Sequence, residues 1–317
     1  MSRTYSTVAV VGAVGSFYGG LLARAGHAVT LVGRAAHVEA IARDGLRVEW
    51  ADRSERIRVG ASAGLAAARG ADIVLVCVKS NDTEATAREL APLLPERAVV
   101  VSLQNGVDNP RLLKLHLRQT VIPVAVYVAL ALPAAGVVRH FGRGDLVIGA
   151  MRGEPAGASE AGSIDVVLGR LVELFATADV AVRISADVMV ELWGKLVINC
   201  AYNGISALAQ IPYARLAAVA EIRTLQRAIV DEAVAVAAAD GVTLSAEASM
   251  LAVEAIAAGM PEQLSSTAQD LARGKRSEID HLNGFVARRG SELGLAAPVN
   301  QALHALVKLV ESNRGTR

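Results

Sequence analysis

The stretch Val8–Gly20, VAVVGAVGSFYGG, decides the fold. Its first residues, Val8–Val11, are mostly β-branched and predict a buried strand, and Ser16–Arg24 predicts the helix that follows. Glycines between a strand and a helix let backbone N–H groups face an anion at the positive end of the helix dipole. The stretch therefore indicates either a turn that binds the pyrophosphate of a dinucleotide or a tight strand-to-helix turn without a ligand.

The turn itself is shorter than the usual dinucleotide fingerprint, G-x-G-x-x-G. Either Val10 occupies the first glycine position, or two residues are missing from the turn. The second alternative keeps Val8–Val11 in register as a strand, and we favour it. The candidate cofactor-binding residues of the turn are Gly12, Ala13, Val14 and Gly15.

Strands and helices alternate through the first half of the chain. Ala28–Val32 is predicted to be a second strand, and the continuous apolar runs Asp72–Val78 and Ala98–Leu103 are typical of parallel strands covered on both faces. Helices are predicted over Ala35–Asp44 and Asp82–Leu94. We therefore expect an α/β fold with a Rossmann-type, doubly wound parallel sheet.

Further strands are predicted around this parallel core. Leu46–Trp50 and Ile57–Gly60 are expected to be short additional strands. Beyond them, three segments separated by Gly and Pro are expected to form antiparallel strands at the edge of the sheet: Val121–Leu130, Val137–Phe141 and Leu146–Ile148. A helix at Ile164–Ala176 and a strand at Val180–Ile184 complete the first domain.

After Ser185 the apolar residues recur at helical spacing. We predict a Rossmann-type nucleotide-binding domain over residues 1–186 and an all-α C-terminal domain over residues 187–317. Gly241 is expected to end one helix, and Pro298 stands at the start of the last. The predicted helices are Val188–Tyr202, Ile222–Asp240, Ser245–Ala258, Ser277–Leu293 and Val299–Ser312.

Composition argues against several classes of partner. The net charge is +1 and only 3% of residues are aromatic, so neither nucleic acid nor an anionic membrane is an expected partner. Cys77 and Cys200 lie in apolar runs, which indicates buried free thiols of a reducing compartment, and no Cys/His cluster suggests a metal. The longest apolar run, Val121–Val138, is interrupted by proline and glycine and falls short of the roughly 20 residues of a membrane span. We expect a soluble cytoplasmic protein.

Two basic residues follow the strands that should flank the glycine turn. In NAD-binding domains an acidic residue after the second strand accepts the ribose 2′-hydroxyl. Arg34 stands there instead, and its forked donors suit the 2′-phosphate of NADP. Lys79 follows the third parallel strand, where it could reach the same phosphate. The alternative is two solvated surface cations; the favoured cofactor is NADPH.

The segment Glu191–Asn203 carries the strongest catalytic signal. Lys195, Asn199 and Asn203 are spaced by four, so they share one face of a helix whose other residues are largely apolar. Hydride transfer to a ketone leaves negative charge developing on oxygen, and a protonated lysine can stabilise that charge and donate a proton. The alternative is a lysine at a domain edge, with amides that cap neighbouring chains.

A second group of candidates lies further along the chain. Ser266 and Asp270 are four residues apart, and Glu278 lies in the first turn of a predicted helix. Ser266 could instead cap a helix, and Glu278 could simply favour a helix N-terminus. Their pairing with Lys195 rests on the resemblance that follows.

The chain resembles the ketopantoate reductase (2-dehydropantoate 2-reductase) family over nearly its whole length. The resemblance rests on the glycine turn, the strand-end Arg34 and Lys79, and a lysine-asparagine helix. It also rests on four further segments: Gln104-Asn105-Gly106, Gly142–Gly149, Ser265–Asp270 and Ser277–Gly284. This family reduces ketopantoate to pantoate with NADPH, on the route to pantothenate and coenzyme A.

The resemblance implies a role for each matching residue. Lys195 corresponds to the family's general acid, and Glu278 to a second active-site residue that helps hold substrate. Asn105 corresponds to a residue close to both nicotinamide and substrate, while Arg34 and Lys79 correspond to contacts with the NADPH phosphate. The positions that correspond to ketopantoate-binding residues are Asn199, Asn203 and Ser266. The chain departs from the family at Gly204, where a proline is common.

Other functions remain open on the sequence alone. A relative of the same build could act on another α-keto acid or as an opine-type dehydrogenase. A nucleotide-binding sensor is a third possibility, because the glycine turn is short. The amphipathic C-terminal helices could support a homodimer.

Overall fold

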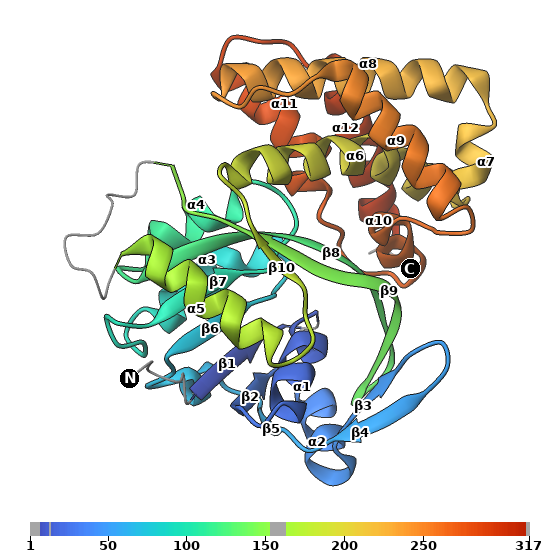
Figure 1. Cartoon of the computed structure of the whole chain (residues 1–317). Coiled ribbons are helices and arrows are strands. Elements are labelled where there is room, and N and C mark those ends of the chain that lie inside the picture. Colours follow the sequence, from blue (N-terminus) through green and yellow to red (C-terminus); the bar gives the residue numbers. More distant parts are fainter. Residues whose placement is uncertain (1–6, 13, 153–162, 315–317) are drawn as a thin grey trace. The chain divides into compact units, whose positions relative to one another are not determined.

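The computed structural model describes residues 7–12, 14–152 and 163–314 of the chain. It divides into two compact units, Met1–Val188 and Met189–Arg317 (Figure 1). The first unit is built on a sheet and the second on helices. This confirms the predicted order of an α/β domain followed by a helical one.

A parallel sheet forms the centre of the first unit. Its strands run in the order β5-β2-β1-β6-β7-β8, all parallel, as in a doubly wound sheet. The strands are continuous apolar runs because helices cover both faces of a parallel sheet. The bounds are β1 Thr7–Val11, β2 Ala28–Val32, β5 Gly60–Ser62, β6 Ile73–Val76, β7 Val99–Ser102 and β8 Thr120–Ala134.

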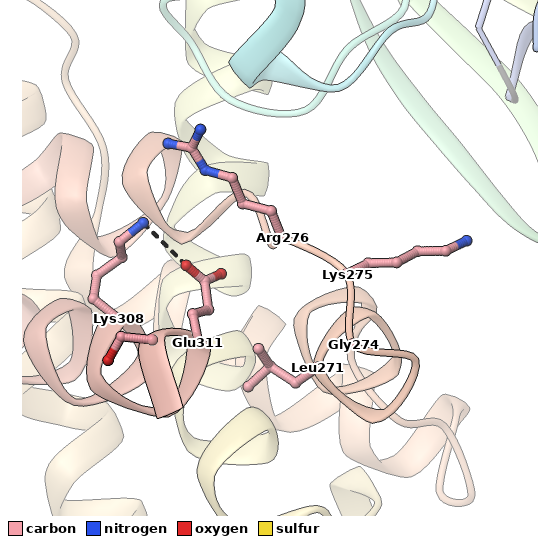
Figure 2. A pocket seen from close by; sticks show the side chains of 7 residues that line it. Leu271, Gly274, Lys275, Arg276, Lys308 and Glu311 are labelled. Atoms are coloured by element: carbon pink, nitrogen blue, oxygen red, sulfur yellow. Dashed lines mark ion pairs between the residues drawn. The ribbon is translucent and has the colours of Figure 1, made fainter. Parts of the chain in front are cut away.

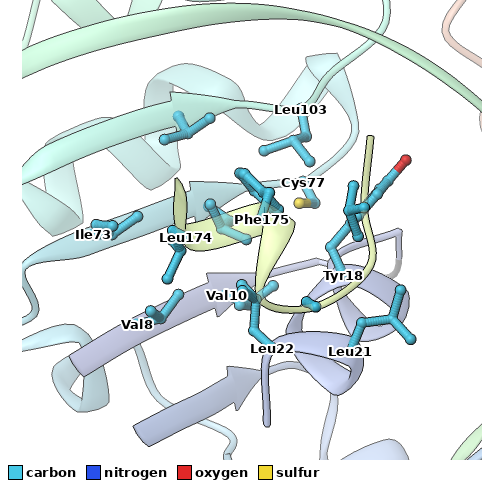
Figure 3. Packing of buried hydrophobic residues seen from close by; sticks show 14 of the residues in the cluster. Val8, Val10, Tyr18, Leu21, Leu22, Ile73, Cys77, Leu103, Leu174 and Phe175 are labelled. Atoms are coloured by element: carbon cyan, nitrogen blue, oxygen red, sulfur yellow. The ribbon is translucent and has the colours of Figure 1, made fainter. Parts of the chain in front are cut away.

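Alternate residues of β1 enter two different cores. Val8 and Val10 pack with residues of helices α1 (Gly15–Arg24) and α5 (Ile164–Ala176), which lie on one face of the sheet (Figure 3). Ala9 and Val11 point to the other face, where helices α3 (Thr83–Leu90) and α4 (Asn109–Lys114) contribute to a second core. The sheet therefore lies between two layers of helices. Helix α2 (Ala35–Asp44) follows β2.

A long hairpin corrects the predicted edge strands. β8 and β9 (Val137–Ile148) are antiparallel, as expected, but they lie inside the sheet, whose main path is β4-β3-β9-β8-β7-β6-β1-β2-β5. β8 pairs with β7 through its first residues and with β9 through the rest, so neither strand is an edge. The two strands expected at 137–141 and 146–148 are one, because two bulges at Phe141 and Gly144 carry the strand through the glycines.

The short strands also differ from expectation. Residues 57–60 do not form one strand. They separate β4 (Ser54–Ile57), which pairs with β3 (Leu46–Glu49), from β5 at the opposite end of the sheet. β10 (Val182–Ile184) pairs in parallel with β9.

The second unit consists of helices with one unexpected break. The predicted helix Ser277–Leu293 is a 3₁₀ turn, η4 (Ile279–His281), followed by α11, because Leu282 leaves the helical region at φ −112° and ψ −107°. Gly241, at φ +84°, ends α8 as predicted. The α-helices are α6 Val188–Ala209, α7 Tyr213–Ala217, α8 Ala220–Ala239, α9 Ala246–Gly259, α10 Ser266–Ala272, α11 Asn283–Glu292 and α12 Pro298–Arg314.

Helix α6 continues well past the departure from the family at Gly204. A side chain at this position would contact Cβ of Leu303 at 3.3 Å, so the glycine lets α12 pack closely against α6. Both cysteines are free and buried, as predicted, and burial raises the pKa of each thiol. In the described part of the chain, no helix is long and apolar enough to cross a membrane.

Candidate active site

The glycine turn follows β1 directly. Val10 is fully buried within β1, paired with Leu31 and Leu75, so it does not occupy a position in the turn. Gly12 is the first residue after the strand, at φ +116°, and a Cβ atom there would lie 2.2 Å from the carbonyl oxygen of Cys77. The structure therefore supports a turn that lacks two residues.

Close packing also explains Gly15, the first residue of α1. A Cβ atom at Gly15 would lie 2.1 Å from Cγ1 of Val10, so the helix approaches β1 as near as backbone allows. Among the described residues, no side chain caps α1 at Val14, and its first turn holds no acidic residue. The first amide groups of α1 are thus compatible with an anion. Ala13 lies outside the described residues.

Arg34 and Lys79 both follow strands that flank β1. Arg34 is exposed and immediately precedes α2, and half-buried Lys79 immediately precedes the 3₁₀ turn η2 (Ser80–Asp82). Because β2, β1 and β6 are parallel neighbours, Gly12, Arg34 and Lys79 all lie at the carboxyl edge of the sheet. Ligands of open α/β sheets bind at this edge.

Asn105 lies in the loop that follows β7. Residues 101–104 and 106–110 are buried, and together they form a platform from which the half-buried Asn105 extends. Its carbonyl oxygen accepts hydrogen bonds from Oγ of Ser80 at 3.1 Å and from Nδ2 of Asn109 at 2.6 Å. Neither buried partner was predicted from the sequence. Ser80 opens η2 and Asn109 opens α4, and buried polar residues at such positions need hydrogen-bond partners, which was the available signal.

Helix α6 places Lys195, Asn199 and Asn203 on one face, as predicted. Lys195 and Asn199 are half-buried, and Asn203 is only 3% exposed. The intervening residues Leu196, Val197 and Cys200 are fully buried, so the helix is held rigidly behind this polar face.

Ser266 joins this face from a distant part of the sequence. Nδ2 of Asn203 lies 3.4 Å from Oγ of Ser266 and donates a hydrogen bond to it across 63 positions of sequence. The cap of α10 is Ser265, whose Oγ accepts from the backbone N–H of Ala268. The capping role considered for Ser266 is therefore wrong, and its exposed hydroxyl lies beside Asn203.

Glu278 precedes η4 and does not lie in the first turn of an α-helix, because of the break at Leu282. The residues on either side of it are anchored to α12. Ser277 donates through both its backbone N–H and its Oγ to Oε1 of Glu311, at 2.8 and 2.6 Å. Asp280 contacts His304 at 2.7 Å and Lys308 at 2.9 Å. Half-buried Glu278 is thus carried on a fixed backbone.

Charges around Asp280 favour its carboxylate. Burial alone would raise its pKa, but hydrogen bonds from His304, Lys308 and Arg276 hold the pKa of Asp280 well below its usual range. Lys308 also pairs with Glu311 beside a cavity of about 340 Å³ (Figure 2). The lining of this cavity includes Lys275 and Arg276 from the segment that leads to Glu278.

The described residues contain no group of three or more His, Cys, Asp or Glu side chains placed to hold a metal ion. Asn203 and Ser266 are two candidate residues that the structure brings into direct contact. The nucleotide-binding candidates and Asn105 belong to the first unit, while Lys195, Asn199, Asn203, Ser266 and Glu278 belong to the second.

Two models of one protein family match most of the chain. The family model described as "Ketopantoate reductase PanE/ApbA" matches residues 8–153, and its C-terminal counterpart matches residues 187–311. The chain belongs to the ketopantoate reductase family. It is therefore an oxidoreductase, and both halves of the family's architecture are present.

Individual proteins similar to this ketopantoate reductase family member belong to the same family. A 2-dehydropantoate 2-reductase of Halobacterium salinarum is 34% identical over 304 residues, which span 95% of this chain and 96% of the relative. The crystal structure of a PanE/ApbA family ketopantoate reductase from Ralstonia eutropha JMP134 has a TM-score of 0.89 and 47% identity, and covers 98% of this chain and 99% of that one.

The same fold also serves another oxidoreductase. A D-mandelate dehydrogenase solved with NADH and anilino(oxo)acetate has a TM-score of 0.88 but only 21% identity, over 98% of this chain and 99% of that one. At that identity the likeness concerns the fold alone. The fold does not determine the substrate of this ketopantoate reductase family member, which depends on the residues of its own site.

Proposed function

We propose that this protein reduces ketopantoate to pantoate, with NADPH as the reductant and Lys195 as the general acid. The observation that carries the proposal is the polar face of α6, on which Asn203 donates to Ser266. It brings a lysine, two amides and a hydroxyl onto connected elements, which is the donor set that a small α-keto acid requires. Family membership over both units supports the same reaction.

In this proposal each side chain of the second unit has one task. The Lys195 ammonium faces the carbonyl oxygen of the substrate, stabilises the negative charge that develops there, and donates the proton that completes the alcohol. Asn199, Asn203 and Ser266 hold the substrate carboxylate through N–H and O–H donors. Glu278 orients the substrate from the segment anchored on α12.

The first unit fits a dinucleotide. Gly12 forms a turn that no residue with a Cβ could form, because that atom would meet the Cys77 carbonyl, and the uncapped N-terminus of α1 suits a pyrophosphate. Arg34 and Lys79 supply cations for a 2′-phosphate at the same sheet edge, and Asn105 lies near nicotinamide and substrate. When bound, NADPH supplies the hydride.

The test is NADPH oxidation with ketopantoate, pyruvate, 2-oxoisovalerate and phenylglyoxylate. We expect ketopantoate to have a kcat/KM at least about tenfold above the others, because a site that pairs substrate hydroxyl groups rejects analogues that lack them. A preference for another keto acid would replace the substrate but keep the chemistry. A ligand at 100 times its Kd raises the free energy of unfolding by about 2.7 kcal/mol, so bound NADPH should raise the melting temperature. An unchanged melting temperature at such an NADPH concentration would contradict the proposal.

A further inference from the structure

A directed chain of buried hydrogen bonds ends on Asn105. Oγ of Ser102 donates to Oε1 of Gln104 at 3.1 Å, and Nε2 of Gln104 donates to Oγ1 of Thr83 at 2.7 Å. Thr83 donates to Oδ1 of Asn109 at 2.7 Å, and Nδ2 of Asn109 donates to the carbonyl oxygen of Asn105 at 2.6 Å.

Every link of this chain is removed from water. The exposed fraction is 2% for Ser102, 5% for Gln104, 0% for Thr83 and 1% for Asn109. In such surroundings a hydrogen bond is electrostatically stronger than in water, and a broken link leaves a buried group unpaired.

Backbone carbonyl groups fix the direction of this chain of hydrogen bonds at Gln104 and at Asn109. The second hydrogen of the Gln104 amide goes to the carbonyl oxygen of Val78 at 3.1 Å, and a carbonyl can only accept. Gln104 must therefore donate to Thr83, so the Thr83 hydroxyl must donate to Asn109. The Asn105 carbonyl at the far end demands the same orientation of Asn109, whose remaining hydrogen goes to Ser80 at 3.0 Å.

This arrangement constrains a backbone that would otherwise be free to move. Asn105 lies in the loop between β7 and α4, and the next residue, Gly106, has φ +90°. Two donors on one carbonyl, from Ser80 and Asn109, fix the Asn105 peptide and hence the direction in which its side chain leaves the platform.

We infer that Thr83 is a positioning residue, whose hydroxyl aims Asn105 at the reacting groups by setting the direction of the chain. The inference rests on the proposed function, in which Asn105 lies close to nicotinamide and substrate. Thr83 is the first residue of α3 and sits midway along the chain, because it both accepts from Gln104 and donates to Asn109.

The closing experiment compares Thr83→Val, which keeps the shape and loses the hydroxyl, with Thr83→Ser, which keeps the hydroxyl. We expect Thr83→Val to lower kcat for the keto acid by about 10–100-fold with a smaller change in KM for NADPH, since a small misplacement at the reacting centre has that effect. Thr83→Ser should recover most of the activity. Hydrogen exchange of the backbone amides of residues 103–108 should be faster in Thr83→Val and near wild type in Thr83→Ser.

Wild-type turnover in Thr83→Val, or equal losses in both variants, would overturn the inference. If Thr83→Val does not fold, Gln104→Met keeps the volume but removes the amide that directs the Thr83 hydroxyl, and we expect the same changes on a smaller scale; unchanged turnover and exchange would then overturn the inference. If the wild-type protein reduces no keto acid, the proposed function fails, and the exchange comparison alone decides whether the chain holds Asn105.

Discussion

Asn283 donates a hydrogen bond through Nδ2 to the backbone carbonyl oxygen of Cys200, at 3.1 Å, across 83 positions of sequence. Cys200 lies one residue beyond Asn199 on α6, and Asn283 ends the segment that begins beside Glu278. The same amide donates to Oδ1 of Asn300 at 2.9 Å, and Asn300 is held by Glu232 at 2.8 Å. A fully buried polar bridge thus ties the element of Glu278 to the helix of Lys195.

The first prediction concerns Lys195. Lys195→Ala should lower kcat by about 10²–10⁴-fold, the usual contribution of a general acid, and should change the melting temperature little because the side chain is half-buried. The measurement is steady-state NADPH oxidation with saturating keto acid. Lys275→Ala, an exposed lysine of the same unit, is the matched control. Full turnover by the Lys195 variant would exclude it as the acid.

A second prediction concerns the preference for a phosphorylated cofactor. Arg34→Ala should raise KM for NADPH by about 10-fold or more, because a charged hydrogen bond contributes about 1.5–3 kcal/mol, and should leave NADH nearly unaffected. Arg58→Ala is the control, because it removes an exposed arginine at the amino end of β5, away from the carboxyl edge where Arg34 lies. It should change neither the KM for NADPH nor that for NADH. Equal losses with NADH and NADPH would remove Arg34 from the phosphate site.

A third prediction separates close packing from backbone strain at the glycine turn. Gly12→Ala should prevent normal folding of the first unit or abolish NADPH binding, because its Cβ would meet the Cys77 carbonyl at 2.2 Å. Gly26→Ala is the control, since Gly26 has φ +94° but no atom within 4 Å of a new Cβ. It should cost only about 1–2 kcal/mol of backbone strain. Thermal unfolding and NADPH titration of both variants check this, and equal effects would mean that strain alone explains Gly12.

The sequence predicted the parts of the fold that local patterns determine. The bounds of β2, α2 and α5 agree with the predicted ranges to the residue, because each is a strong apolar pattern bounded by breaking or capping residues. The neighbours of β9 could not be inferred, because strand pairing depends on contacts between distant segments. The two bulges likewise exist only in relation to β8.

The same division holds for the candidate site. The polar face of α6 followed from a spacing of four residues, which is a local property of a helix. The partners that fix it are distant: Asn203 meets Ser266 across 63 positions, and Thr83 meets Gln104 across 21. A sequence shows that such residues are polar, but only the fold shows which of them pair and in which direction the hydrogen bonds run.

The last prediction concerns the anchor of Glu278. Asp280→Asn should lower the free energy of unfolding of the second unit by about 1–2 kcal/mol at pH 7, because Lys308 and Arg276 lose an ion-pair partner and His304 loses a charged acceptor. The pKa of Asp280 is depressed in the folded protein, so its stabilisation is present above the unfolded pKa of about 3.9 and is lost as pH falls through the folded value. The difference between wild type and variant should therefore narrow in acid.

Urea unfolding between pH 3 and 7 measures this, and Glu254→Gln supplies the control. Glu254 pairs with Arg223 at 3.0 Å but is 44% exposed, so its loss should cost no more than about 0.5 kcal/mol and vary little with pH. The Asp280 variant should also lower kcat, since the backbone beside Glu278 loses its hold on α12 while Ser277 and Glu311 keep theirs. A stability difference that grows as pH falls would contradict the depressed pKa, and unchanged kcat with reduced stability would show that the anchor serves folding alone.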